Sequence, residues 1–356
     1  MPVPRTTLSS PSGRRSGRRR VYQVLAAFVV LAALAGYLAV QYLSGSKDLL
    51  TGCEVRYDDG TKDAGVRTYE MGADQAASAA TIAAVGAAHG MPERAVAIAL
   101  ATAIQESQLR NIDYGDRDSL GLFQQRPSQG WGSAEQIQDP VYASGKFYEH
   151  LAKISGYQDL PLTEAAQRVQ RSGFPEAYAQ HEPDAILLAS ALTGRMPAAL
   201  NCAAPVTATA AAPGDPDRLR TELVRDFGKG VLPAEESAAP AARTVAVPVA
   251  ERATGGAEPA DAGGTDGGDA SSTGATDSTD STGSTDAATG ARRGWSVALW
   301  AVARSGELGI DEIRYAGRVW TPGTGWRADE AGSKEATKAA DAADSDSGEV
   351  RMRLAQ

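Results

Sequence analysis

One glutamate, Glu106, stands at the end of the uncharged, alanine-rich segment 95–105. Apolar residues occur on nearly every face of this segment, which predicts a core helix that delivers Glu106 from its last turn. A carboxylic acid held against apolar walls ionises reluctantly, because desolvation disfavours the charged form. It can therefore stay protonated near neutral pH and give its proton to a leaving oxygen, as cleavage of a glycosidic bond requires. The simpler alternative is a glutamate that caps the helix or faces water.

Two more short motifs follow Glu106 along the chain. Residues 121–124 read G-L-F-Q, and residues 177–178 read A-Y. Together with the pair Glu106 and Ser107, they resemble the three ordered signatures of soluble lytic transglycosylases and goose-type lysozymes. This lysozyme-like superfamily cleaves the bond between MurNAc and GlcNAc in peptidoglycan. The resemblance covers residues 53–202, so it implies a fold and an activity for less than half of the chain.

The resemblance implies a role for each matching residue. Glu106 corresponds to the general acid that protonates the glycosidic oxygen, and Ser107 to a residue that orients this acid or contacts the acetamido group. Gln124 matches a glutamine that hydrogen-bonds the sugar, and Tyr178 matches a tyrosine that holds the acid. The third signature usually reads A-Y-N, whereas Ala179 follows Tyr178 here. This departure keeps open the alternative of a protein that has kept the cleft and lost turnover.

Other polar and aromatic residues near these motifs are candidates for contact with sugar. Ser119, Gln125 and Trp131 are predicted to line the cleft, because a sugar site combines amide and hydroxyl groups with aromatic faces. Ordinary packing under a loop is an equal alternative for Trp131. The three histidines are interpreted as surface or hydrogen-bonded residues, the commoner roles of a lone histidine: His89, His150 and His181.

Three aspartates, Asp113, Asp116 and Asp118, lie between Glu106 and G-L-F-Q. Inverting hydrolases place a second carboxylate roughly 6.5–9.5 Å from the acid to activate water, so one of these residues could make the protein a muramidase. The transglycosylase pattern needs no such base, because the 6-hydroxyl of the sugar attacks and leaves a 1,6-anhydro product. Aspartates also stabilise turns. A calcium loop is disfavoured because D-Y-G-D-R-D lacks the distal glutamate of an EF-hand, and no metal or cofactor is expected.

The amino-terminal region predicts a membrane anchor. Six arginines lie in residues 1–20, and the apolar run 21–43 is longer than the roughly 20 residues that span a bilayer. The positive-inside rule then puts residues 1–20 in the cytoplasm as a basic tail, with residues 44–52 as a stalk outside. A cleaved signal peptide or a lipobox at L-T-G-C, residues 50–53, are the alternatives. The net charge of −9 argues against a nucleic-acid partner.

The chain has two cysteines, Cys53 and Cys202, which bracket the candidate catalytic region. An even pair in an oxidising compartment predicts a disulfide. Two free thiols are the alternative, but they fit poorly with a location outside the membrane. Neither cysteine has the C-x-x-C spacing of a metal or redox site.

The fold class expected for residues 53–202 is mostly α: a lysozyme-like helical domain with a small amino-terminal hairpin. Apolar periodicity and turn residues predict strands at 53–57 and 66–71. The helices expected after this hairpin, from capping residues and periodicity, are 74–89, 92–109, 139–154, 163–169 and 183–192, with a short segment at 175–178. Asp139 is expected to cap the third of these helices and Thr163 the fourth.

A linker at 203–214 and a small α+β module at 215–356 are expected to follow. A disordered, low-complexity insertion at 251–292 interrupts this module because it has too little apolar surface to fold. The elements expected around it are a helix at 215–227, a strand at 244–249, an amphipathic helix at 295–308, a hairpin at 313–320 and a strand at 350–354. Residues 294–321 faintly resemble a module related to zinc D-Ala-D-Ala peptidases, but every histidine precedes them, so the expected role is binding or spacing.

The sequence thus predicts a single-pass, outward-facing enzyme that cleaves peptidoglycan, as a lytic transglycosylase or a muramidase with Glu106 as general acid. Its expected partners are peptidoglycan glycan strands and, through one helix, the membrane. The competing hypothesis is a catalytically inactive peptidoglycan-binding or scaffold protein of the cell envelope.

Overall fold

A computed structural model describes part of the chain. The described residues are 52–57, 66–171, 175–203, 213–233, 243–249, 282–329 and 348–356. The predicted basic tail, the apolar run 21–43, most of the stalk and residues 251–281 of the predicted insertion lie outside them. No helix within the described ranges has the length and apolar character needed to cross a membrane.

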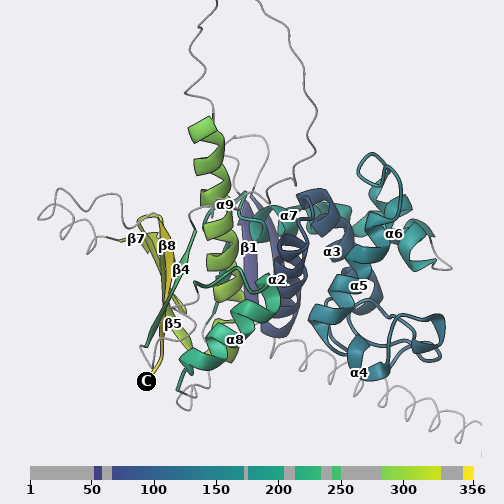
Figure 1. Cartoon of the computed structure of the whole chain (residues 1–356), viewed down its shortest axis with the longest axis horizontal. Coiled ribbons are helices and arrows are strands. Elements are labelled where there is room, and N and C mark those ends of the chain that lie inside the picture. The colour runs from purple at the N-terminus through teal and green to yellow at the C-terminus, as the bar shows by residue number, and fades with distance from the viewer. Residues whose placement is uncertain are drawn as a thin grey trace, which may run out of the picture. The chain divides into compact units, whose positions relative to one another are not determined.

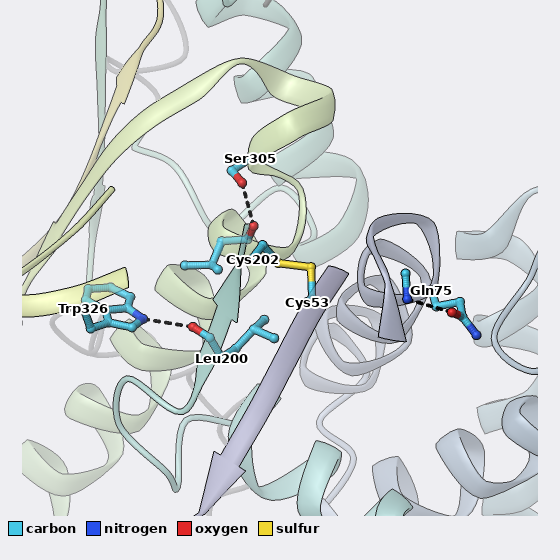
Figure 2. Close-up of a disulfide and its surroundings, with 8 residues drawn as sticks. Cys53, Gln75, Leu200, Cys202, Ser305 and Trp326 are labelled. Atoms are coloured by element: carbon cyan, nitrogen blue, oxygen red, sulfur yellow. Dashed lines mark hydrogen bonds between the residues drawn. A yellow bond between two sulfur atoms is a disulfide. The ribbon is translucent and has the colours of Figure 1, made fainter. Parts of the chain in front are cut away.

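The predicted amino-terminal hairpin is confirmed, and it belongs to a larger sheet than expected. β1 (Gly52–Tyr57) pairs antiparallel with β2 (Arg67–Gly72), and a short strand, β3 (Leu200–Cys202), pairs with the other edge of β1. This register places Cys53 opposite Cys202, and the two form the predicted disulfide, which Figure 2 shows. The bond therefore ties the start of the helical region to its end.

Helices follow the sheet and form the rest of the amino-terminal part. The longer ones are α2 (Ala73–Ala88), α3 (Glu93–Ser107), α5 (Pro140–Ala152), α6 (Leu162–Gln170) and α7 (Glu182–Leu192). The shorter ones are η1 (Pro127–Gln129), α4 (Ala134–Ile137) and η2 (Pro175–His181). Every residue from 95 to 104 of α3 is buried, and α3 contacts α2, α5, α6, α7 and η2. The prediction of a core helix that ends near Glu106 is confirmed.

Some helix ends agree with the prediction and others differ. Asp139 caps α5, because its Oδ1 accepts a hydrogen bond of 2.9 Å from the Val141 amide. α3 ends at Ser107, earlier than predicted, because Gln108 and Leu109 have φ of 55° and 59° and turn the chain away. α6 begins at Leu162, so the predicted cap at Thr163 is wrong.

The carboxy-terminal part contains one antiparallel sheet and three helices within the described ranges. α8 (Pro216–Phe227) precedes β4 (Thr244–Pro248), and α9 (Thr282–Ala303) and α10 (Ser305–Leu308) precede the remaining strands. Those strands are β5 (Ile310–Tyr315), β6 (Arg318–Thr321), β7 (Gly325–Ala328) and β8 (Glu349–Leu354). The strand order is β4-β8-β5-β6-β7. The predicted hairpin at 313–320 and the predicted strands at 244–249 and 350–354 are confirmed.

α9 differs from its predicted counterpart in three respects. It begins at Thr282, inside the predicted insertion, and it ends at Ala303 rather than Leu308. It is also not amphipathic in its second half, because residues 294–303 are buried on every face. The reason is that α9 lies between two layers: it contacts β5 and β8 on one side and α2, α7 and β3 on the other, as Figure 1 shows for β5 and α2.

The described residues from 52 onward therefore form one compact unit, and nearly all of their buried apolar side chains belong to one hydrophobic cluster. Hydrogen bonds join the two parts directly. Ser296 Oγ donates to the carbonyl of Leu192 at 2.7 Å. Trp326 Nε1 donates to the carbonyl of Leu200 at 3.1 Å, as Figure 2 shows. The predicted linker at 203–214 thus separates, along the chain, two parts that share a core.

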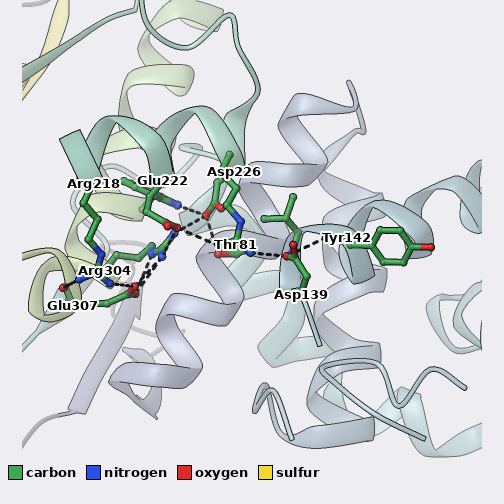
Figure 3. Close-up of polar contacts among 11 residues, drawn as sticks. Thr81, Asp139, Tyr142, Arg218, Glu222, Asp226, Arg304 and Glu307 are labelled. Atoms are coloured by element: carbon green, nitrogen blue, oxygen red, sulfur yellow. Dashed lines mark hydrogen bonds and ion pairs between the residues drawn. The ribbon is translucent and has the colours of Figure 1, made fainter. Parts of the chain in front are cut away.

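A buried polar cluster on α2, α8 and α9 also joins the two parts (Figure 3). Asp226 Oδ2 pairs with Arg304 at 3.0 Å and accepts hydrogen bonds of 2.8 Å from Thr81 and from the Trp300 indole. Arg304 pairs also with Glu222 at 2.8 Å. A buried charge is costly unless it is paired, so these contacts fix how the three helices pack together.

Candidate active site

The last turn of α3 positions Glu106 beside η2. The Tyr178 hydroxyl donates a hydrogen bond of 2.7 Å to Glu106 Oε1. Tyr178 is 0% exposed, whereas Glu106 is half-buried. The Glu106 side chain is therefore partly open to solvent while its carboxyl is hydrogen-bonded to a buried partner. Glu106 and Tyr178 are 72 positions apart in sequence and belong to two different motifs, and the fold brings them into contact.

Burial raises the pKa of Glu106 above the ordinary glutamate value. Hydrogen bonds from Tyr178 and Gln170 act in the opposite direction, because they stabilise the charged form. Among the described residues, no cation is a cause of this shift. The protonated form of Glu106 therefore extends to higher pH than in an exposed glutamate, which agrees in direction with the expectation from the sequence.

Ser107 ties the end of α3 to the G-L-F-Q segment. Ser107 is 8% exposed. Its hydroxyl can donate a hydrogen bond to the Leu122 carbonyl at 2.7 Å or to the Ala103 carbonyl at 3.1 Å. Gln170 Nε2 donates to the carbonyl of Phe123 at 2.7 Å, which ties α6 to the same segment. The three motifs therefore meet at Glu106, and Ser107 acts on the local backbone; its contact with sugar stays a prediction.

Gln124 lies over the loop that precedes it. Its backbone has φ of 48°, and its Nε2 donates to the carbonyl of Tyr114 at 3.2 Å. Gly115 makes this position possible, because a Cβ there would collide with the Gln124 amide and lie 2.7 Å from the Ser119 carbonyl. The Gln124 side chain is thus held at the loop surface, half-buried.

Tyr114 is a candidate that sequence reasoning missed. Its side chain is 70% exposed, and among the described phenylalanine, tyrosine and tryptophan residues of 52–203 Tyr57 is the other exposed one, at 41%. The available signal was a single aromatic residue within the polar stretch N-I-D-Y-G-D-R-D. The exposed ring offers a flat apolar surface on the residue whose backbone carbonyl accepts from the Gln124 amide.

Ser119 and Gln125 point into the protein rather than toward an open cleft. Gln125 is 1% exposed, and its Nε2 donates to the carbonyl of Ala143 in α5 at 3.1 Å. Ser119 is 7% exposed. Gln125 therefore has almost no surface to present to a sugar, and its observed role is to anchor the G-L-F-Q segment on α5.

Trp131 packs on α5. Its ring stacks on His150 with centroids 4.2 Å apart, and its carbonyl accepts a hydrogen bond of 3.2 Å from the Tyr142 hydroxyl. These contacts agree with the alternative that Trp131 is an ordinary packing residue. Contact between Trp131 and sugar stays a prediction.

The three aspartates differ in their surroundings. Asp118 accepts hydrogen bonds of 2.8 Å from Arg126 Nε and from the Ser128 amide, and these hold the pKa of Asp118 well below its usual range. Asp113 and Asp116 are exposed. The turn-stabilising interpretation therefore describes Asp118. In the described part of the chain, no group of three histidine, cysteine, aspartate or glutamate side chains could hold a metal ion.

His181 lies nearer to the candidate acid than the sequence suggested. Its Nε2 is 2.9 Å from Gln105 Oε1, so it contacts the residue before Glu106. Burial lowers the pKa of His181, which favours the neutral imidazole. His181 is thus a half-buried partner of α3 rather than a free surface residue.

Comparison with known proteins identifies no relative: no protein-family model and no curated protein sequence matches the chain. The functional assignment depends, for this reason, on the geometry around Glu106 and on the order of the motifs that meet there.

Proposed function

We propose that this protein is a membrane-anchored, extracytoplasmic enzyme that cleaves the MurNAc–GlcNAc bonds of peptidoglycan with Glu106 as general acid. The observation that carries this proposal is the half-buried Glu106 carboxyl on the Tyr178 hydroxyl, at the meeting point of the three motifs. The lysozyme-like fold and activity are part of the proposal.

The hydrogen bond from Tyr178 determines which oxygen delivers the proton. Because the hydroxyl of Tyr178 donates to Oε1, the proton of neutral Glu106 resides on Oε2. This proton passes to the glycosidic oxygen as its bond to the anomeric carbon breaks through an oxocarbenium-like transition state. Tyr178 and Gln170 then stabilise the carboxylate that remains, since their hydrogen bonds favour the charged form.

Attack by the 6-hydroxyl of the sugar, which gives its proton to the Glu106 carboxylate left by the first step, is the second step that we favour over attack by a water activated by a second carboxylate. A muramidase with an inverting mechanism needs a carboxylate that accepts a proton. Asp118 is a weak base because Arg126 and Ser128 hold its pKa low, and Asp113 and Asp116 lie in solvent. The proposed product therefore carries a 1,6-anhydro end.

The proposed location is the outer surface of the cell membrane, with the apolar run 21–43 as the single span. The disulfide between Cys53 and Cys202 supports this location, because such bonds persist in oxidising compartments. Gln124 and the exposed Tyr114 are proposed to contact the glycan strand beside Glu106.

Mass analysis of the fragments released from purified peptidoglycan tests the proposal. The full chain, kept in a mild non-ionic detergent, is expected to release muropeptides with 1,6-anhydro ends. Reducing ends would instead identify a hydrolase that uses water. Binding to peptidoglycan with no released fragment would overturn the enzymatic proposal and support the inactive binding protein that the altered third signature suggests.

A further inference from the structure

A cavity of about 1040 Å³ lies away from Glu106, between the end of α2, the start of α3, the loop after α8 and the first described side chains of α9. Its lining includes Glu93 in the first turn of α3, whereas Glu106 is in the last turn. At about 1.5 Å per residue, these positions are roughly 20 Å apart along the helix. The cavity is therefore distinct from the candidate active site.

Much of the wall of this cavity is apolar and partly open to solvent. Ala87 is exposed, and Met91 and Phe227 are half-buried. Phe227 packs edge-on against Trp300 with ring centroids 5.8 Å apart, so one face of the wall is held by the core. Val96, at the floor, is 1% exposed. This wall suits a hydrocarbon chain, because burial of apolar surface favours binding.

The polar side of the cavity is strongly positive. Lys229, Arg292 and Arg293 line it, and within the described ranges none of the three forms an ion pair with a carboxylate. Glu93 is the acidic residue of the lining, but Arg195 Nε binds both of its oxygens at 2.9 Å and Ser190 donates to it at 2.9 Å. The charge of Glu93 is therefore already balanced outside the cavity, and three cations are left to attract an anion.

We propose that this cavity binds a phosphate-headed amphiphile. The phosphate lies among Lys229, Arg292 and Arg293, and the hydrocarbon chain lies along Ala87, Met91 and Phe227. A free anion would leave this apolar wall in water, and a neutral hydrocarbon would leave three cations without a counter-ion, since the contact of Arg293 with the Gly230 carbonyl at 3.3 Å is with a neutral group. A phosphate monoester carries close to two negative charges near pH 7 and suits three cations better than a carboxylate does.

Native mass spectrometry of the full chain in dodecyl maltoside, with dodecyl phosphate as probe, tests this site. The detergent is the built-in control, since it has the same alkyl chain and a neutral head. One dodecyl phosphate is expected to bind per chain. The triple variant Lys229→Gln, Arg292→Gln, Arg293→Gln is expected to bind it at least about tenfold more weakly, which corresponds to about 1.4 kcal/mol.

Two further variants separate the charge from the apolar wall. The control triple Arg67→Gln, Arg318→Gln, Arg327→Gln removes the same charge from exposed positions on β2, β6 and β7 and should keep wild-type affinity. Ala87→Trp fills the cavity from an exposed helix position, keeps all three cations and should abolish binding. Melting curves without the probe check that every variant is folded. If the triple variant does not fold, Lys229→Gln alone takes its place.

Three results would overturn the proposal. The first is equal affinity of the wild type and of the Lys229, Arg292 and Arg293 triple variant for dodecyl phosphate, and the second is unchanged binding of the probe by Ala87→Trp. The third is binding of inorganic phosphate to this site as tightly as dodecyl phosphate. Octyl phosphate should bind more weakly than dodecyl phosphate, since each buried methylene contributes about fourfold in affinity. Glu106→Gln should bind the probe like the wild type, so this site and the proposed enzymatic activity stand or fall separately.

Discussion

At the scale of single residues, the pKa of Glu106 is the balance of two opposing effects. Burial raises this pKa, whereas the hydrogen bonds from Tyr178 and Gln170 lower it. A general acid works best when its pKa lies near the operating pH, because it must hold its proton and then release it. Tyr178 therefore has a tuning role as well as a positioning role, and its removal should change both the pH profile and the rate.

Tyr178→Phe is expected to raise the pKa of Glu106 further, since it removes a hydrogen bond that lowers it. In the proposed mechanism the active form of Glu106 is protonated, so activity should fall as pH rises through this pKa. The basic limb of the pH–rate profile should accordingly move to higher pH. Turnover should fall roughly 10- to 100-fold, because a hydrogen bond to a charged group is worth about 1.5–3 kcal/mol.

The matched control for this measurement is Tyr148→Phe. It removes a buried hydroxyl that donates to the Ile82 carbonyl at 2.9 Å and does not touch Glu106. A basic limb that stays in place in Tyr178→Phe, or that moves equally in both variants, would show that Tyr178 does not set the pKa of the acid.

At the scale of elements, the loop 110–121 and the G-L-F-Q segment depend on each other. The Gly121 amide donates to the Ile112 carbonyl at 2.8 Å, and the Gln124 side chain lies across Gly115. A side chain at position 115 would displace Gln124 from the surface beside Tyr114. This loop is therefore expected to govern substrate affinity more than the chemical step.

Gly115→Ala should raise KM for glycan strands severalfold and leave kcat nearly unchanged, because it moves Gln124, the proposed binding residue, and not Glu106. Gly306→Ala, at an exposed position where a Cβ meets nothing within 4 Å, is the control. A fall in kcat with unchanged KM, measured from initial rates of fragment release, would contradict this role for the loop.

The disulfide acts on another element, the three-stranded sheet. Cys53 and Cys202 are 149 positions apart, and β1 lies between β2 and β3. Replacing both cysteines by serine should lower the free energy of unfolding by about 4–5 kcal/mol in the chain-entropy model. Urea unfolding should give the same midpoint for this variant and for the reduced wild type. Wild-type stability in the double variant would refute the structural role of the bond.

Local patterns were enough to predict several elements. The burial of α3 on all sides, the cap at Asp139 and the hairpin 313–320 were predicted correctly, because each depends on residues close in sequence. β3 was missed because three residues, L-N-C, are too few to show alternation. The loop position of Gln124 and the exposure of Tyr114 were missed for a related reason: both follow from how the loop folds back on itself.

At the scale of the whole molecule, α9 joins parts that looked separate in the sequence. The pattern of residues 295–308 suggested one solvated face, but β5 and β8 cover one side of α9 and α2 and α7 cover the other. The buried cluster around Asp226 was equally hidden, because its partner Thr81 is 145 positions away in sequence. Contacts of this kind depend on the packing of distant elements, which local patterns do not reveal.

Arg304→Met is expected to lower the free energy of unfolding by about 3–5 kcal/mol, since it leaves the buried charge of Asp226 without its cation. Arg304→Met combined with Asp226→Asn should recover part of this loss, because asparagine carries no charge and can still accept from Thr81 and Trp300. Because both parts share one core, far-UV circular dichroism and tryptophan fluorescence should report one coincident transition. Two separate transitions in the wild type would contradict a shared core.

The most direct test of the central claim compares initial rates of peptidoglycan cleavage by the wild-type chain, Glu106→Gln and the control Glu70→Gln, which changes an exposed glutamate on β2. Loss of a general acid should slow cleavage by at least about 100-fold. We expect that loss in Glu106→Gln and wild-type rates in Glu70→Gln, with both variants folded. Equal rates for the wild type and Glu106→Gln would contradict the assignment of Glu106 as the catalytic acid.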